Sequence, residues 1–215
     1  MARRLRSISL SGPAGRLEAL LEEPASDRRM LRAVVICHPH PQFGGTMHNK
    51  VVYRMAKAAR GERSAVLRFN YRGVGMSEGT YDGGVGEQDD LRAAMQYMRS
   101  RHPGVPLAVG GFSFGARVAL RVCCRDTHAD RVVAVGTPVN SGDWTHLRQC
   151  ECPKIFIQSS RDEFGSRDNL RRVYEDAGHP KRLYWVEARD HFFTDALDAL
   201  EATARGALGQ AGKRR

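Results

Sequence analysis

Short apolar runs recur along this chain, and most of them are followed by a segment with helical periodicity. Runs this short and this rich in valine, leucine and isoleucine are typical of strands buried on both faces. We predict strands at residues 31–39, 64–73, 106–112, 131–139, 154–160 and 182–188. We predict helices at residues 49–61, 87–101, 114–125, 166–178 and 194–208. Repeated strand-helix-strand units predict a mostly parallel sheet with helices on both faces.

The first segment departs from this alternation. Residues 4–24 contain two short strand patterns around a Gly-Pro-Ala-Gly turn, which predicts a hairpin that forms an antiparallel edge. The 215 residues are enough for one substantial core but leave little room for a second. We therefore expect a single α/β domain over residues 1–215, with a sheet of about eight strands.

The charge balance raises the question of an anionic partner, because the formal net charge is +10. The basic residues are scattered, and no predicted helix carries a continuous basic stripe. This favours a solvated arginine-rich surface over specific nucleic-acid binding, with at most some steering of anionic ligands. The sequence has neither a signal-length apolar run after its first arginines nor eighteen consecutive apolar residues. We expect a cytoplasmic protein without a membrane span.

The spacing of the five cysteines does not indicate a disulfide framework. Cys37 lies in an apolar run, and Cys123 and Cys124 lie in a predicted buried helix. Cys150 and Cys152 are one residue apart, without the second Cys or His pair that a zinc site needs. We therefore expect reduced thiols and no disulfide.

The pattern Gly-x-Ser-x-Gly occurs twice, as GMSEG around Ser77 and as GFSFG around Ser113. A nucleophile elbow must lie on a strained turn between a strand and a helix. GFSFG meets this requirement, because a strand pattern leads into it and a helical pattern follows. GMSEG does not, because the glycine-rich GTYDGG follows it. Ser113 is therefore the predicted nucleophile, and Ser77 a loop residue.

A serine nucleophile needs a histidine base and an acid that orients the base. In this type of fold the chain order is serine, acid, histidine, with the last two on loops after later strands. Asp162 directly follows one predicted strand and His191 directly follows another. Glu163 is the nearest alternative acid, and Asp190 adjoins His191 but should point elsewhere as its neighbour.

Two backbone N–H groups should form an oxyanion hole. One is that of Phe114, directly after Ser113. The other should come from the loop HPHPQFGGTMHN, in which the two prolines have no N–H. His40 is the first candidate, with Gln42 or Phe43 as alternatives. The histidines of this loop also suggest a metal site, but no nearby carboxylate or cysteine completes a ligand set, so none is expected.

With the strand-GFSFG-helix unit followed by Asp162 and His191, the chain resembles the α/β-hydrolase superfamily over nearly its whole length. HPHPQFGGTMHNKVV and RFNYRGVGMSEG are similar to small bacterial predicted esterases or hydrolases related to the dienelactone-hydrolase group. The resemblance implies Ser113 as nucleophile, Asp162 as acid, His191 as base and the HPHP loop as the oxyanion segment. Dienelactone hydrolases proper use a cysteine, so the resemblance does not extend to their substrate.

Many esterases and lipases of this superfamily carry a helical cap, and this chain lacks the length for one. Only about a dozen residues, NSGDWTHLRQCECP, separate two predicted strands at the position of the cap. The site should therefore be open. Each aromatic or methionine side chain in the surrounding loops either lines it or packs beneath a loop. These residues are Phe43, Met76, Trp144, Phe164, Phe192 and Phe193.

The sequence thus predicts a serine hydrolase that cleaves carboxylic esters or thioesters through an acyl-enzyme, with a small-molecule ester as substrate and no cofactor. A peptidase or lactone hydrolase with the same three residues, and a non-catalytic binding protein of this fold, remain alternatives. Activity should decline below about pH 6.5, where histidine protonates. Oligomeric state cannot be inferred from the sequence.

Overall fold

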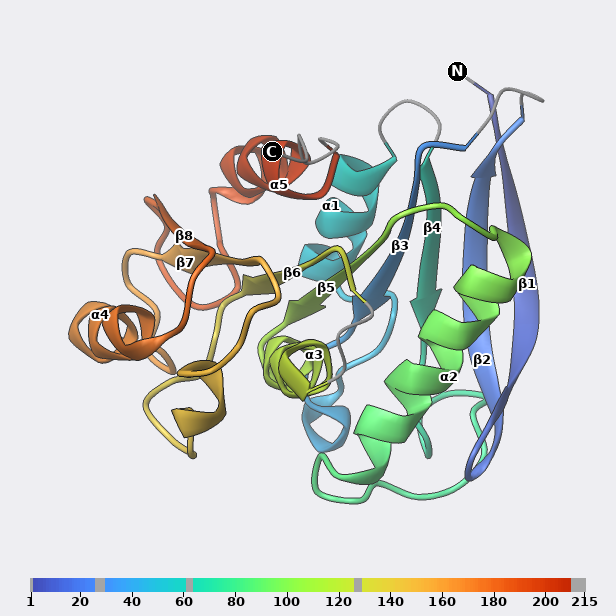
Figure 1. Cartoon of the computed structure of the whole chain (residues 1–215), viewed down its shortest axis with the longest axis horizontal. Coiled ribbons are helices and arrows are strands. Elements are labelled where there is room, and N and C mark those ends of the chain that lie inside the picture. The colour runs from blue at the N-terminus through green and yellow to red at the C-terminus, as the bar shows by residue number, and fades with distance from the viewer. Residues whose placement is uncertain (1, 26–29, 61–63, 126–128, 210–215) are drawn as a thin grey trace.

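The central element of the computed structural model is a twisted sheet of eight strands (Figure 1). The structure describes residues 2–25, 30–60, 64–125 and 129–209. The strands are β1 (Arg3–Gly12), β2 (Gly15–Pro24), β3 (Arg32–Cys37), β4 (Ser64–Phe69), β5 (Leu107–Phe112), β6 (Arg131–Val135), β7 (Lys154–Ser159) and β8 (Lys181–Val186). The predicted hairpin and all six later strands are confirmed.

The strand order is β1-β2-β4-β3-β5-β6-β7-β8. β1 and β2 pair antiparallel, as do β2 and β4, and every other pair is parallel. β3 lies between β4 and β5, so the chain proceeds to one side of β3 first and then to the other. Ligands of open α/β sheets bind at such a switch point, beyond the carboxyl ends of the strands. The HPHP loop follows β3, and the GFSFG turn joins β5 to α3.

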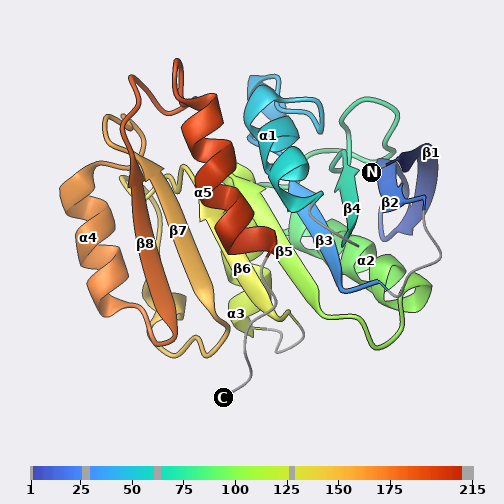
Figure 2. The same cartoon turned by 90° about the horizontal axis from the view of Figure 1, so that it is seen from above.

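Helices cover both faces of the sheet, as predicted (Figure 2). They are α1 (Lys50–Ala59), α2 (Gly86–Arg101), α3 (Phe114–Arg125), α4 (Arg167–Asp176) and α5 (Leu197–Gly209). Residues of α1 and α5 pack with one face in one apolar cluster, and residues of α2, α3 and α4 pack with the other face in a second. Gly61, predicted to end the first helix, lies outside the described residues. No described helix is long and apolar enough to cross a membrane.

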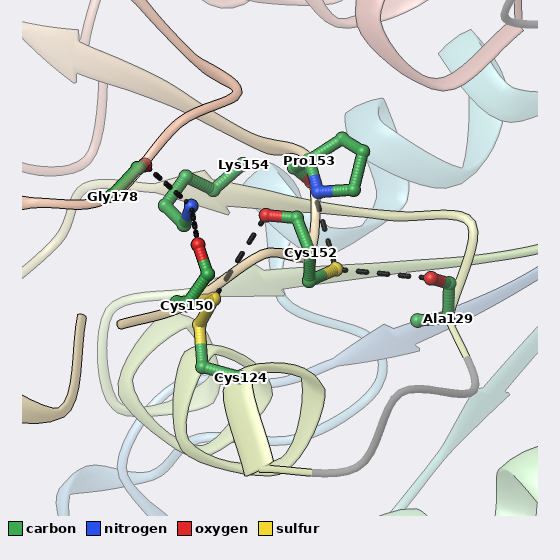
Figure 3. Close-up of a disulfide and its surroundings, with 7 residues drawn as sticks. All are labelled: Cys124, Ala129, Cys150, Cys152, Pro153, Lys154 and Gly178. Atoms are coloured by element: carbon green, nitrogen blue, oxygen red, sulfur yellow. Dashed lines mark hydrogen bonds between the residues drawn. A yellow bond between two sulfur atoms is a disulfide. The ribbon is translucent and has the colours of Figure 1, made fainter. Parts of the chain in front are cut away.

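The expectation of wholly reduced cysteines is wrong. Cys124, near the end of α3, forms a disulfide with Cys150, 26 residues further along the chain (Figure 3). Cys37, Cys123 and Cys152 are not part of this disulfide. The loop before β7 returns beneath the carboxyl end of α3 and brings the two cysteines together. The buried Lys154 holds this loop, because its Nζ donates hydrogen bonds to the carbonyls of Cys150 and Gly178, each at 2.7 Å.

The expectation that no helix carries a basic stripe is also wrong for α3. Arg117, Arg121 and Arg125 recur every four residues over its length. Side chains four apart lie on the same face of an α-helix. The three arginines therefore form one row, although the apolar residues between them separate the charges in the sequence.

Candidate active site

Ser113 occupies the single residue between the end of β5 and the start of α3. Its φ of 56° lies in the left-handed region, which a residue with a side chain adopts at a cost of about 1–3 kcal/mol. The flanking glycines are required sterically. A Cβ on Gly111 would lie 2.2 Å from the carbonyl oxygen of Gly115, and a Cβ on Gly115 would lie 2.6 Å from that of Cys37. GFSFG thus allows α3 to start directly against the sheet, with the serine at the turn.

Ser77 has a structural role in the GMSEG loop. Its Oγ donates a hydrogen bond to the carbonyl of Asn70 at 2.8 Å and accepts one from the N–H of Glu18 at 2.9 Å. The side chain is buried. These two bonds fasten the loop to β2, and the hydroxyl proton is committed to a backbone acceptor.

Asp162 lies on the loop after β7 and is held by four N–H donors. Its Oδ1 accepts hydrogen bonds from the backbone N–H groups of Phe164 and Gly165, at 2.9 and 3.0 Å. Its Oδ2 accepts one from Nε2 of Gln158 at 2.9 Å and lies 2.8 Å from Nδ1 of His191. An ionised carboxylate only accepts hydrogen bonds, so Nδ1 carries the proton and Nε2 of a neutral His191 is left as a base.

His191 lies on the loop after β8 and is enclosed by aromatic rings. Its imidazole stacks on Phe112 with ring centroids 4.9 Å apart, and Phe164 makes an edge contact at 4.8 Å. Gly136 leaves room for the ring, because a Cβ there would lie 3.1 Å from Cε1 of His191. The side chain is buried. Packing and the bond to Asp162 therefore fix its orientation together.

The two alternative acids bind backbone instead of the imidazole. Oε2 of Glu163 accepts a hydrogen bond from the backbone N–H of His191 at 2.9 Å. Oδ1 of Asp190 accepts bonds from the N–H groups of Phe192 and Thr194. Both carboxylates shape the loop that carries His191, and of the three acids only Asp162 contacts its ring nitrogen.

The expected oxyanion donors differ in whether their N–H groups already donate hydrogen bonds within the protein. The N–H of Phe43 donates to the carbonyl of His40 within the short 3-10 helix η1 (Pro41–Phe43), and the N–H of Gln42 donates to Nδ1 of His40. The N–H groups of His40 and Phe114 donate to no atom of the described residues. The geometry therefore favours these two as donors to a bound group.

Ser113 and His191 line the same pocket, which has a volume of about 560 Å³. Its walls are largely apolar, and of the six expected wall residues they include Phe43, Phe164 and Phe192. The side chain of Phe43 is 85 % exposed, so the pocket is open to solvent on that side.

The other three expected wall residues do not line this pocket, which corrects their assignment. The backbone N–H of Met76 binds Glu18 Oε2, which ties the residue to the hairpin. Trp144 is buried beneath its loop and donates from Nε1 to the carbonyl of Ser141. Phe193 is fully buried in the apolar cluster of α1 and α5. For Trp144 and Phe193, packing beneath a loop is the correct alternative.

Three residues that the sequence patterns do not identify support the site. Gln158, buried at the end of β7, both donates to Asp162 and accepts from the N–H of Thr137. The Tyr81 hydroxyl lies 3.1 Å from Nε2 of His40. Arg117 lines the pocket, and its Nη2 donates to the carbonyls of Pro138 and Ser141. Each of these residues reaches the site through the packing of loops, which no local sequence pattern encodes.

Both ring nitrogens of His38 form hydrogen bonds with backbone groups. Its Nδ1 lies 2.6 Å from the carbonyl of Pro39, and its Nε2 accepts the N–H of Tyr71 at 3.1 Å. Burial lowers the pKa of His38 to about 4. Its role is to connect the HPHP loop to the end of β4, and neither ring nitrogen is available to a metal. Among the described residues no three His, Cys, Asp or Glu side chains are grouped to hold a metal ion.

Comparison with known proteins identifies the family to which the chain belongs. The family model described as an alpha/beta hydrolase domain matches residues 32–213. An uncharacterised protein of Rickettsia prowazekii (strain Madrid E) is 34 % identical over 195 residues, which cover 86 % of this chain and 81 % of that protein.

Solved structures show the same fold. A serine hydrolase without a lid from Xanthomonas campestris is 32 % identical with a TM-score of 0.86, covering 95 % of this chain and 94 % of that one. An alpha-beta serine hydrolase homologue from Coxiella burnetii is 31 % identical with a TM-score of 0.88, covering 95 % and 97 %. The described part of the chain between β6 and β7 contains only the short 3-10 helix η2 (Thr145–Leu147) and no cap. The chain belongs to the α/β-hydrolase family and is a member without a lid.

Proposed function

We propose that this protein is a serine hydrolase that cleaves carboxylic esters or thioesters through an acyl-enzyme intermediate. One observation carries the proposal. Ser113, held at a φ of 56° between β5 and α3, lines the same pocket as His191, whose Nδ1 is hydrogen-bonded to Asp162. A strained serine, a base with its tautomer fixed and an orienting carboxylate are the groups that acyl transfer requires.

In the proposed reaction, Oγ of Ser113 attacks the substrate carbonyl while Nε2 of His191 takes its proton. The N–H groups of Phe114 and His40 stabilise the oxyanion that forms. The imidazolium then returns the proton to the leaving alcohol or thiol as the bond to the carbonyl carbon breaks. Water, deprotonated by the same imidazole, attacks the acyl-serine and releases the acid, which restores the free hydroxyl of Ser113.

The lining of the pocket and its open form favour substrates with small to medium-sized apolar acyl groups. Aromatic side chains and prolines make up much of its wall, and no cap closes over it. An apolar wall binds an acyl or alkyl group by the area it removes from water. The serine hydrolase of Xanthomonas campestris, which is 32 % identical, supports the same class of nucleophile.

The test is hydrolysis of matched p-nitrophenyl esters, acyl thioesters and anilides by wild type, Ser113→Ala and Ser77→Ala. We expect turnover of the esters or thioesters by wild type and a loss of kcat by about 10³-fold or more in Ser113→Ala. Ser77→Ala is the matched control, because it removes the other serine of the same pattern. It should retain kcat at temperatures where it is folded.

Two outcomes would contradict the proposal. An anilide turned over faster than the matched ester would favour a peptidase. Turnover by Ser113→Ala equal to wild type, with all three proteins equally folded by circular dichroism, would remove Ser113 as the nucleophile.

A further inference from the structure

A second pocket lies between α2, α3 and the loop before η2, and it shares no lining residue with the pocket of Ser113. Its volume is about 400 Å³. The charged and polar side chains around it are Gln88, Asp89, Arg92, Arg121, Arg125, Asp143 and His146. The row of arginines on α3 thus begins at the candidate active site with Arg117 and ends in this second pocket.

Two of these arginines make no direct contact with an acceptor among the described residues. No hydrogen bond or ion pair joins Arg121 or Arg125 to another described residue, and Arg121 acts on Asp143 only at a distance, where its charge adds to the hydrogen bonds from Thr145 in lowering the pKa of that carboxyl. Like charges four residues apart on a helix repel each other. The two carboxylates of the pocket are engaged elsewhere, since Asp89 pairs with Arg92 at 2.7 Å and Asp143 accepts bonds from the backbone and hydroxyl of Thr145. The pocket is lined by three arginines and two carboxylates and so carries an excess of positive charge.

His146 contributes an unsatisfied nitrogen to the same place. Its Nε2 is buried and has no hydrogen-bond partner within the described parts of the chain. A buried polar atom without a partner costs about 1–3 kcal/mol, and because this atom has almost no accessible surface it does not itself face a molecule in the pocket. Burial, together with the charges of Arg121 and Arg125, lowers the pKa of His146. A neutral imidazole still offers one N–H donor.

The loop that forms one wall of the pocket is held in place before any ligand binds. The disulfide between Cys124 and Cys150 ties the end of α3 to the loop that carries Asp143 and His146. Nη2 of Arg117 fastens the start of that loop through the carbonyl and hydroxyl of Ser141. A prearranged site loses less conformational entropy on binding.

We propose that this pocket binds the phosphate group of a small soluble molecule, with Arg121 and Arg125 as its cationic partners. Guanidinium groups bind phosphate oxygens with paired, charge-assisted hydrogen bonds. A phosphate group has enough acceptor oxygens for both side chains. The volume exceeds that of a phosphate alone, so there is room for the part of the ligand that carries it.

The test is isothermal titration of the intact, disulfide-bonded protein with inorganic pyrophosphate, and separately with inorganic phosphate. We expect one pyrophosphate site per chain in wild type, and an affinity about tenfold or more lower in Arg121→Gln and in Arg125→Gln. The matched control is Arg171→Gln on α4, which removes the same charge from an exposed position and should bind as wild type does.

Melting curves without anion establish that each variant is folded. Ser113→Ala should bind pyrophosphate as wild type does, because the two pockets are separate. The proposal is overturned if millimolar pyrophosphate gives no binding heat, or if Arg171→Gln loses as much affinity as Arg121→Gln. It is also overturned if the chain binds anionic phospholipid vesicles or DNA through these arginines but does not bind the soluble phosphates.

Discussion

Asp162 shows how one carboxylate is oriented by its surroundings. Two backbone N–H groups occupy Oδ1, and Nε2 of Gln158 shares Oδ2 with His191. Rotation of the carboxylate would break several of these bonds at once, and each is worth about 1 kcal/mol or more when the acceptor is charged. The acid therefore holds the imidazole by an orientation that the β7 loop itself determines.

Replacing this acid by its amide should leave His191 without an unprotonated Nε2 to accept the proton of Ser113. In Asp162→Asn the backbone donors keep the amide oxygen at the Oδ1 position, so the NH₂ group faces Nδ1 of His191. The imidazole then favours the tautomer with its proton on Nε2, which cannot accept one from Ser113. We expect kcat for ester hydrolysis to fall by about 10³–10⁴-fold with little change in KM. Asp190→Asn keeps its Oδ1 acceptor and should change kcat little, and equal losses in both variants would contradict the assignment.

His38 should make stability depend on pH. Its pKa is about 4 in the folded chain and 6.5 in the unfolded one, so the unfolded state binds the extra proton between these values. The stabilisation is present above about pH 6.5 and is lost as the pH falls toward about 4. We expect urea unfolding to show a loss of about 2 kcal/mol from this residue between pH 7 and pH 5. His38→Gln should lose correspondingly less over that range, and equal losses in both proteins would refute the contribution of His38.

At the scale of elements, α3 depends on close contact with the sheet. Its amino end lies against the carboxyl end of β3, where a Cβ on Gly115 would come within 2.6 Å of the carbonyl oxygens of Cys37 and His38. These are backbone atoms, so the helix itself would have to move. The same contact determines the position of Ser113 and of the Phe114 N–H relative to the HPHP loop.

Two Gly→Ala substitutions in helices should therefore have opposite effects on the stability of the fold. Gly115→Ala should destabilise the fold by about 1–3 kcal/mol through overpacking and lower kcat as well. Gly206→Ala on α5, where a Cβ would meet nothing within 4 Å, should stabilise it by up to about 1 kcal/mol. Chemical denaturation of both variants measures the difference. Equal stability of the two would show that α3 does not need its close approach.

The elements were predictable because their signals are local. Apolar runs, helical periodicity and the strand-GFSFG-helix unit each lie within a dozen or so consecutive residues. The same is true of the strand ends that carry Asp162 and His191, whose contact follows from the order of the strands. The wall of the pocket was less predictable, because Trp144 and Phe193 turn inward under loops whose paths depend on tertiary packing. The arginine row on α3 was present in the sequence as a four-residue repeat, but it could be recognised only by its position on one helix face.

At the scale of the whole molecule, the disulfide between Cys124 and Cys150 connects two layers. It joins α3 on one face of the sheet to the loop that leads into β7. Such a contact between residues 26 apart follows from the return path of the loop, and an odd number of cysteines gives no indication of it.

Breaking this bond should lower stability. Closing a loop of this length stabilises a protein by about 2–4 kcal/mol, so reduction or Cys150→Ser should lower the melting temperature by about 10 °C. The reductant should have no further effect on Cys150→Ser, which serves as the control. Unreduced, denatured wild type should show three reactive thiols, namely Cys37, Cys123 and Cys152. Five reactive thiols before reduction would contradict the disulfide.

The central claim is that Ser113 is the nucleophile of an acyl-transfer reaction. A fluorophosphonate probe modifies a serine only where a base activates it, and peptide mass spectrometry then identifies the residue. We predict that the probe labels the folded wild type and Ser77→Ala on the peptide that contains Ser113, and does not label Ser113→Ala. Labelling that persists in Ser113→Ala and disappears in Ser77→Ala would contradict the account.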